Sequence, residues 1–143
     1  MQRGFTVIEI IIVIAILGVF AGLALPAVNN MIAKQNLDTS AQILASDLRW
    51  VQQLCINTTP DTLFPQIKPL SNKYIVKKGS NVIKTVNLPD GITISGPQTL
   101  TFSINGTPLT DNQPLPATLL LTSKNTTNIR HVIISTVGRI RVE

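Results

Sequence analysis

The chain has 143 residues, enough for one modest domain with an anchor but too few for two full domains. Charged residues make up 13% of it, and the formal net charge of +5 permits a polyanionic partner without requiring one. Cys55 is the only cysteine, which excludes an intramolecular disulfide and a cysteine-based metal site. His131 is the only histidine, with no second acid, base or nucleophile placed beside it, so we expect no enzymatic activity, cofactor or metal.

An apolar run without charges, from Ile10 to Val28, dominates the N-terminus. As a helix it would cover roughly 28 Å at ~1.5 Å per residue, close to the ~30 Å hydrocarbon thickness of a bilayer. A secretory signal peptide has a shorter apolar region, and Leu25-Pro26-Ala27 makes a poor cleavage site. A plain membrane anchor explains the length and keeps Arg3 in the cytoplasm. It does not explain Glu9, because an ionised side chain within a membrane segment costs about 2.5–3.5 kcal/mol.

The residues Gly4-Phe5-Thr6-Val7-Ile8-Glu9, followed by this apolar run, resemble the class III signal of type IV pilins and pseudopilins. The resemblance implies that a prepilin peptidase cleaves after Gly4, leaving a four-residue leader behind, and that the new N-terminus, Phe5, is N-methylated. It also implies that Glu9 neutralises the N-terminal ammonium of a neighbouring subunit inside a filament. A charge pair in hydrocarbon is strongly favoured over either charge alone, so this pairing would explain the buried carboxylate.

The same resemblance implies a domain plan and a set of partners. Residues 1–4 would be the leader, residues 5–28 a membrane-spanning and filament-core helix, and residues 29–143 a head in the periplasm or at the cell surface. The N-terminus would lie in the cytoplasm. The implied partners are other pilins or pseudopilins, the prepilin peptidase and the inner-membrane assembly machinery.

Gly22 and Pro26 lie four residues apart within the apolar run. Pro26 cannot donate a helical hydrogen bond to the Gly22 carbonyl, and glycine lowers the resistance of the helix to unwinding. We interpret the pair as a weak point where the helix bends or stretches during filament packing. The alternative is that glycine and proline are simply common in membrane helices.

The helical pattern continues through residues 29–56 but becomes amphipathic. Its apolar stripe has steps of four and three and consists of Leu37, Ala41, Leu44, Leu48, Val51 and Cys55, widened by Ile43, Trp50 and Leu54. Asp47 and other polar residues lie largely off it. We expect this stripe to cover the core of the head, with Cys55 as a small buried side chain.

After the helix the chain changes to short β segments separated by turn residues. Residues 57–72, which hold three prolines, are expected to form a connector, and residues 73–143 a β region. The expected strands are Lys73–Lys77, Val82–Leu88, Ile92–Ser95, Leu100–Ile104, Ala117–Ser123, Ile129–Val137 and Gly138–Val142. Asn105-Gly106 indicates a hairpin. The predicted fold class is therefore α+β, a type IV pilin-like long helix packed on about six or seven mostly antiparallel strands.

This order of elements resembles the minor pilins of the GspH/FimT type. Gly138-Arg139-Ile140-Arg141 matches a Gly-Arg-x-Arg pattern that DNA-binding members of that family use in natural transformation. In a strand, Arg139 and Arg141 share one face and can contact phosphates, with Lys124 and Arg130 as candidates to extend the patch. Glu143 and the terminal carboxylate cancel much of this charge, so terminal arginines that serve only solubility are the alternative.

Three hypotheses about function follow. The first is a minor subunit that primes or caps a type IV pilus, and the second is the equivalent pseudopilin of a type II secretion machine. The third adds to the first the sequence-independent binding of DNA for uptake.

Overall fold

The computed structural model describes residues 6–58 and 63–143, apart from the side chains of residues 23–27. The predicted processing residues Gly4 and Phe5 therefore lie outside the described residues, as does the side chain of Pro26.

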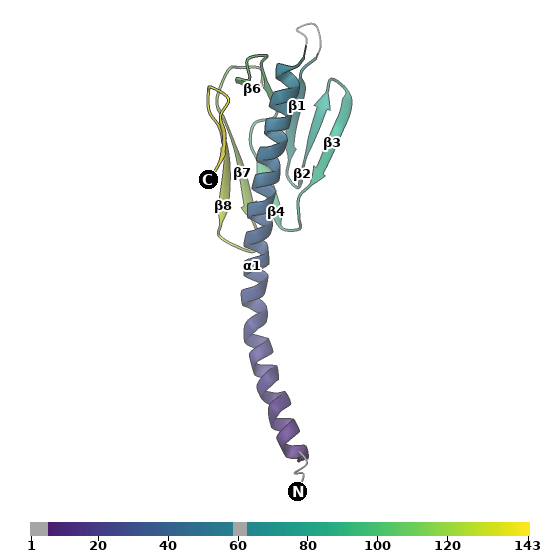
Figure 1. The fold of residues 1–143 in the computed structure, drawn as a ribbon, viewed down its shortest axis with the longest axis vertical. Helices are drawn as coiled ribbons and strands as arrows, with labels where there is room; N and C mark the ends of the chain where they lie inside the picture. The colour runs from purple at the N-terminus through teal and green to yellow at the C-terminus, as the bar shows by residue number, and fades with distance from the viewer. Residues whose placement is uncertain (1–5, 59–62) are drawn as a thin grey trace.

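A long helix, α1 (Val7–Ile56), runs the length of the molecule and has two halves of different character (Figure 1). Its N-terminal half projects away from the strands, and its C-terminal half packs against them. Asn57 is the C-cap, which agrees with the predicted end of the helix. An all-apolar first half and an amphipathic second half are what the residue pattern dictates for a helix that enters a domain partway along its length.

The strands follow α1 and form two antiparallel sheets. They are β1 (Pro65–Leu70), β2 (Lys73–Lys78), β3 (Asn81–Asn87), β4 (Ile92–Ser95), β5 (Leu100–Phe102), β6 (Pro108–Thr110), β7 (Ala117–Ser123), β8 (Ile129–Ile134) and β9 (Ile140–Val142). One sheet has the order β3-β2-β1-β5-β6 and the other the order β4-β7-β8-β9. The α+β class is thus confirmed, a long N-terminal helix packed on antiparallel sheets.

The core lies between α1 and both sheets. The helix contributes the whole predicted stripe, because Leu37, Ala41, Leu44, Leu48, Val51 and Cys55 are all fully buried. The five-stranded sheet adds Ile67, Tyr74, Val76, Leu100 and Phe102, and the four-stranded sheet adds Leu119, Leu121, Val132 and Ile134. Every second residue of β2 and β7 points inward, as the period of two requires.

Two details of the predicted stripe are wrong. Ile43 and Trp50 are exposed, so the apolar face of α1 is wider than the sheets cover. Asp47, placed off the stripe, is instead buried, because a hydroxyl and an ammonium from the five-stranded sheet bind its carboxylate.

The predicted connector over residues 57–72 is also wrong in part, because residues 65–70 form β1 in the middle of the five-stranded sheet. The sheet accommodates the prolines of this segment because of where they lie in the strand. Pro65 is the first strand residue, and Pro69 lies beyond Ile67↔Leu100, the one partner pair between β1 and β5. The strands β1 and β6 were not predicted, and with them the number of strands in the described residues exceeds the predicted six or seven.

Candidate assembly and binding sites

The projecting half of α1 presents a long row of exposed apolar side chains. Its bulky side chains from Val7 to Phe20 are exposed on all sides, from 50% for Ile16 to 77% for Val7. A folded domain seldom exposes a contiguous apolar surface of this extent unless another molecule or a membrane covers it. Within the described residues, no helix meets the combined length and hydropathy expected of a membrane span.

Glu9 lies in the first turn of this helix and forms a capping box with Thr6. The Glu9 N–H donates to Thr6 Oγ1 at 3.3 Å, and the Thr6 N–H donates to Glu9 Oε2 at 3.5 Å. A carboxylate at this end of a helix also meets the positive end of the helix dipole. The spacing Thr6-x-x-Glu9 before an apolar run could have predicted this cap, which the sequence analysis missed.

The predicted weak point at Gly22 and Pro26 lies inside α1, which is helical throughout this stretch. A Cβ added at Gly22 would meet nothing within 4 Å, so packing inside this subunit does not require glycine there. The interpretation of the pair as a hinge for filament packing stays a prediction.

At the other end of the molecule, the predicted DNA-binding residues Arg139 and Arg141 are both exposed, while Ile140 between them is buried. Arg139 is in the β8–β9 turn, where its N–H donates to Ser135 Oγ at 3.1 Å. Arg141 is in β9 and pairs with Glu143 at 3.0 Å, the charge cancellation that the sequence indicates.

The end of α1 holds this turn in place through two side chains that sequence reasoning missed. Gln52 Nε2 donates to the Gly138 carbonyl at 2.9 Å and to the Gly106 carbonyl at 2.7 Å, joining the β8–β9 turn to the β5–β6 turn. Arg49 donates to the Ile140 carbonyl at 3.2 Å. Gly138 has φ +82°, and a Cβ there would collide with the Gly106 carbonyl, so no other residue fits this approach.

The other two predicted patch residues do not join the arginines. Arg130 in β8 binds Asp38 of α1 at 2.6 Å and so ties the four-stranded sheet to the helix. Lys124 lies in the β7–β8 turn, where its N–H donates to the Gly91 carbonyl. Lys124 and Arg130 are near the start of β8, whereas Arg139 is near its end, where the Ser135 N–H donates to the Arg139 carbonyl. The six residues of β8, at ~3.3 Å each, separate its two ends by roughly 20 Å.

A buried polar cluster links α1 to the five-stranded sheet. Tyr74 donates to Asp47 Oδ2 at 2.8 Å, and Lys84 Nζ lies 2.7 Å from Asp47 Oδ1 and 6.0 Å from the Trp50 ring centroid. Burial raises the pKa of the Tyr74 hydroxyl, and the hydrogen bond to the Asp47 carboxylate adds to this effect. No periodicity in the sequence pairs these residues, because they come from α1, β2 and β3.

The described residues include one histidine and one cysteine, His131 and Cys55. They contain no group of three histidine, cysteine or acidic side chains that could hold a metal ion. Burial raises the pKa of the Cys55 thiol, which favours the unreactive protonated form. His131 is half-buried in β8, and its backbone exchanges two hydrogen bonds with Glu143.

Comparison with known proteins agrees with the N-terminal pattern. Residues 1–25 match the family described as the prokaryotic N-terminal methylation motif. The chain is 33% identical over 96 residues to a protein named fimbrial protein from Moraxella nonliquefaciens, covering 64% of this chain and 61% of that one. It is 35% identical over 94 residues to a type IV major alpha-pilin from Moraxella bovis, covering 61% and 59%. No solved structure matches the chain.

The chain spans less than two thirds of the length of either Moraxella relative. These relatives are named as a fimbrial protein and a major pilin, so the assignment to the GspH/FimT minor-pilin subfamily stays a prediction. The chain carries a prokaryotic methylation motif at its N-terminus and is similar, over part of its length, to proteins named as type IV pilins.

Proposed function

We propose that this chain is a type IV pilin subunit, anchored in the cytoplasmic membrane before it joins a filament. The observation that carries the proposal is the projecting half of α1, whose bulky apolar side chains from Val7 to Phe20 are exposed. A bilayer can cover this surface before assembly, and the equivalent helices of neighbouring subunits can cover it afterwards. The methylation motif over residues 1–25 supports the same function.

The start of the helix fits a processed N-terminus. If a prepilin peptidase cleaves after Gly4, the ammonium of Phe5 lies four residues before Glu9, in reach of the Glu9 carboxylate of the same or a neighbouring subunit. A carboxylate inside an apolar helix bundle requires such a partner, because an unpaired charge in this environment is strongly disfavoured.

Intact-mass analysis of the chain from its native host tests the proposal. We expect a mature chain that begins at N-methylated Phe5 and is present in sheared filaments. A Gly4→Leu variant, which alters only the predicted cleavage position, should retain its leader and stay out of filaments. A wild-type chain that keeps Met1 would overturn the assignment.

Within this function we propose a minor subunit of the GspH/FimT type that contacts DNA through Arg139 and Arg141. Both arginine side chains are exposed. The backbone on which they stand is fixed to the end of α1, because Gln52 and Arg49 donate hydrogen bonds to its carbonyls. Preorganised arginines can contact backbone phosphates without reading the base sequence. The alternative is a pseudopilin of a type II secretion machine, and the genes beside this one would separate a secretion operon from a pilus operon.

Titration of the detergent-solubilised chain with labelled duplex at two salt concentrations tests the DNA contact. Replacing both arginines by alanine should weaken binding and reduce the slope of log affinity against log salt by about 2, because each arginine neutralises one phosphate. Lys77→Ala with Lys78→Ala removes the same charge from the β2–β3 hairpin and serves as the control. Equal binding by the two double variants would rule out the proposed contact.

A further inference from the structure

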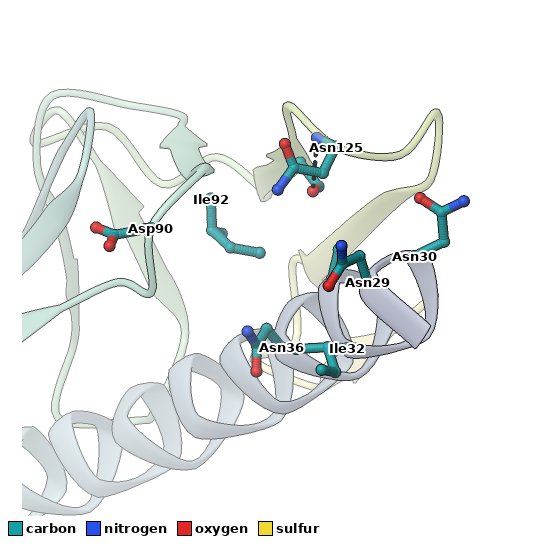
Figure 2. A pocket seen from close by; sticks show the side chains of 9 residues that line it. Asn29, Asn30, Ile32, Asn36, Asp90, Ile92 and Asn125 are labelled. Atoms are coloured by element: carbon teal, nitrogen blue, oxygen red, sulfur yellow. Dashed lines mark hydrogen bonds between the residues drawn. The ribbon is translucent and has the colours of Figure 1, made fainter. Parts of the chain in front are cut away.

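An open pocket lies between one face of α1 and the β7–β8 turn, at the point where the helix leaves the head. It has a volume of about 510 Å³, and its lining includes Asn30 and Lys34 of α1 and residues 125–128 of the β7–β8 turn. A second pocket of about 540 Å³ adjoins it and shares Asn30 and Asn125. Figure 2 shows Asn29 and Asn30 of the helix on one side of this second pocket and Asn125 on the other. We call the first of these the base pocket.

The base pocket combines one cation with many neutral donors. Lys34 is exposed, and the carboxylate one helical turn along, Asp38, is bound to Arg130 at 2.6 Å. The Lys34 ammonium therefore has no carboxylate partner among the described residues. Asparagine amides and threonine hydroxyls supply the remaining polar groups. An ammonium with amide and hydroxyl donors is the combination that binds a phosphate.

One hydroxyl of the pocket has no partner. Thr126 Oγ1 is buried and makes no hydrogen bond to any described residue. A buried polar atom that lacks a partner costs free energy, and a ligand that supplies an acceptor would remove that cost. Because Thr126 Oγ1 is buried, a phosphate bound in the pocket would reach it only after a small shift of the β7–β8 turn.

The position of the base pocket along the axis of α1 indicates where the phosphate would come from. From Val7 to Val28 the helix rises by about 32 Å at 1.5 Å per residue, the hydrocarbon thickness of a bilayer. If the projecting half spans the membrane, residues 29–34 lie at the headgroup level. Met31, also in the pocket lining, and its neighbour Ile32 are exposed apolar side chains on the same turn, suited to contact with acyl chains.

We propose that the base pocket binds the phosphate of an anionic phospholipid headgroup and so fixes the depth of the head above the bilayer. Lys34 supplies the charge, and Thr126 and the asparagines supply the hydrogen bonds. The proposal rests on the proposed membrane-anchored function, because only a spanning α1 brings the pocket to this level. Before filament assembly, the bound lipid would hold the subunit at one height in the membrane.

Native mass spectrometry of the full chain in detergent micelles tests the site. The probes are short-chain phosphatidylglycerol, short-chain phosphatidylcholine and inorganic phosphate, each titrated separately. We expect phosphatidylglycerol to be retained in preference to phosphatidylcholine, and inorganic phosphate to bind far more weakly. Equal retention of the two lipids overturns the proposal, and so does inorganic phosphate binding as tightly as phosphatidylglycerol, which would make this a site for soluble phosphate.

Matched variants localise the binding. Lys34→Gln should weaken phosphatidylglycerol binding about fivefold, the value of one basic residue at an anionic surface, and Lys34→Arg should retain it. Thr126→Val, which keeps the shape of the side chain, should also weaken it. Lys78→Gln removes the same charge from the exposed end of β2 and should have no effect. Lys34→Gln binding like wild type would overturn the site.

The two proposals fail separately. A chain that is processed after Gly4 but shows no headgroup preference contradicts the lipid site and leaves the pilin function standing. A chain that keeps its leader in the native host contradicts the pilin function, whatever lipid it binds.

Discussion

The Tyr74 hydroxyl donates a 2.8 Å hydrogen bond to Asp47 Oδ2 inside the core, so a carboxylate of α1 is the acceptor for a buried side chain of β2. Lys84 of β3 completes the cluster from the solvent side at 2.7 Å. On the opposite side of α1, Asp38 pairs with Arg130 of β8. Apolar packing allows a helix to slide or rotate on a sheet, and these directional contacts to both sheets oppose such movement.

Asp47→Ala should destabilise the head by about 1–3 kcal/mol, because it leaves the fully buried Tyr74 hydroxyl without an acceptor. Asp47→Asn should cost less, since the amide oxygen can still accept from Tyr74. Denaturant unfolding of the full chain in detergent measures both. The control is Ser46→Ala, the adjacent exposed residue of α1, which should change stability by no more than about 0.5 kcal/mol. Equal losses for Asp47→Ala and Ser46→Ala would contradict the role of the cluster.

The raised pKa of Tyr74 predicts a loss of stability at alkaline pH. Below the unfolded-state value of about 10, tyrosine is protonated in both states and has no effect on the pH dependence. Above it the unfolded chain loses the proton while the folded chain keeps it, so the free energy of unfolding falls by about 1.4 kcal/mol per pH unit. Tyr74→Phe should lack this component.

Tyr74 is the only tyrosine, so the folded chain should also show no tyrosinate absorption until it unfolds. Wild type and Tyr74→Phe share every lysine, and the difference between their unfolding curves at each pH isolates the tyrosine. Parallel pH profiles for the two chains would contradict the burial of this hydroxyl.

Gln52→Ala should release the β8–β9 turn, because the Gln52 amide is the group that joins the Gly138 and Gly106 carbonyls to α1. We expect faster amide hydrogen exchange in residues 135–139 and a loss of about 1–3 kcal/mol from the two unpaired carbonyls. Gln53→Ala, at the exposed neighbouring position, is the matched control. If both variants exchange at the wild-type rate, Gln52 does not hold the turn.

Local patterns predicted much of this fold. The stripe from Leu37 to Cys55 is buried because a period of 3.6 places those residues on one face whatever covers it. Asn105-Gly106 forms the predicted hairpin turn, in which Gly106 adopts a positive φ. The strand β1 escaped prediction because its prolines disfavour a ladder on local grounds, and only the placement of its neighbours makes their positions acceptable.

The candidate sites were less predictable. Strand alternation accounts for the exposure of Arg141 beside the buried Ile140, whereas Arg139, expected in the same strand, lies in the preceding turn. The ion pair between Arg130 and Asp38 depends on a contact between residues 92 positions apart. Gln52 gave no local signal, since its two acceptors belong to turns that meet only in the folded head. The partners of Arg130 and Gln52 depend on which distant elements pack together, and sequence periodicity does not predict that packing.

Glu9 has two candidate roles that substitution can separate, because it both caps α1 with Thr6 and supplies the only acidic charge in the first turn of the helix. Glu9→Gln keeps an acceptor for the Thr6 N–H and removes the charge. If the carboxylate pairs with the Phe5 ammonium of a neighbour, this variant should begin its helix normally and be lost from filaments, since breaking a buried ion pair costs about 3–5 kcal/mol.

Thr6→Ala makes the opposite change: it removes the capping hydroxyl, worth about 1 kcal/mol, and retains the charge. We expect it to enter filaments at close to the wild-type level. The fraction of each variant in sheared filaments, measured by immunoblotting against the total in the membrane, compares the two. Normal incorporation of Glu9→Gln together with failure of Thr6→Ala would mean that Glu9 acts in assembly through the helix cap and not through its charge.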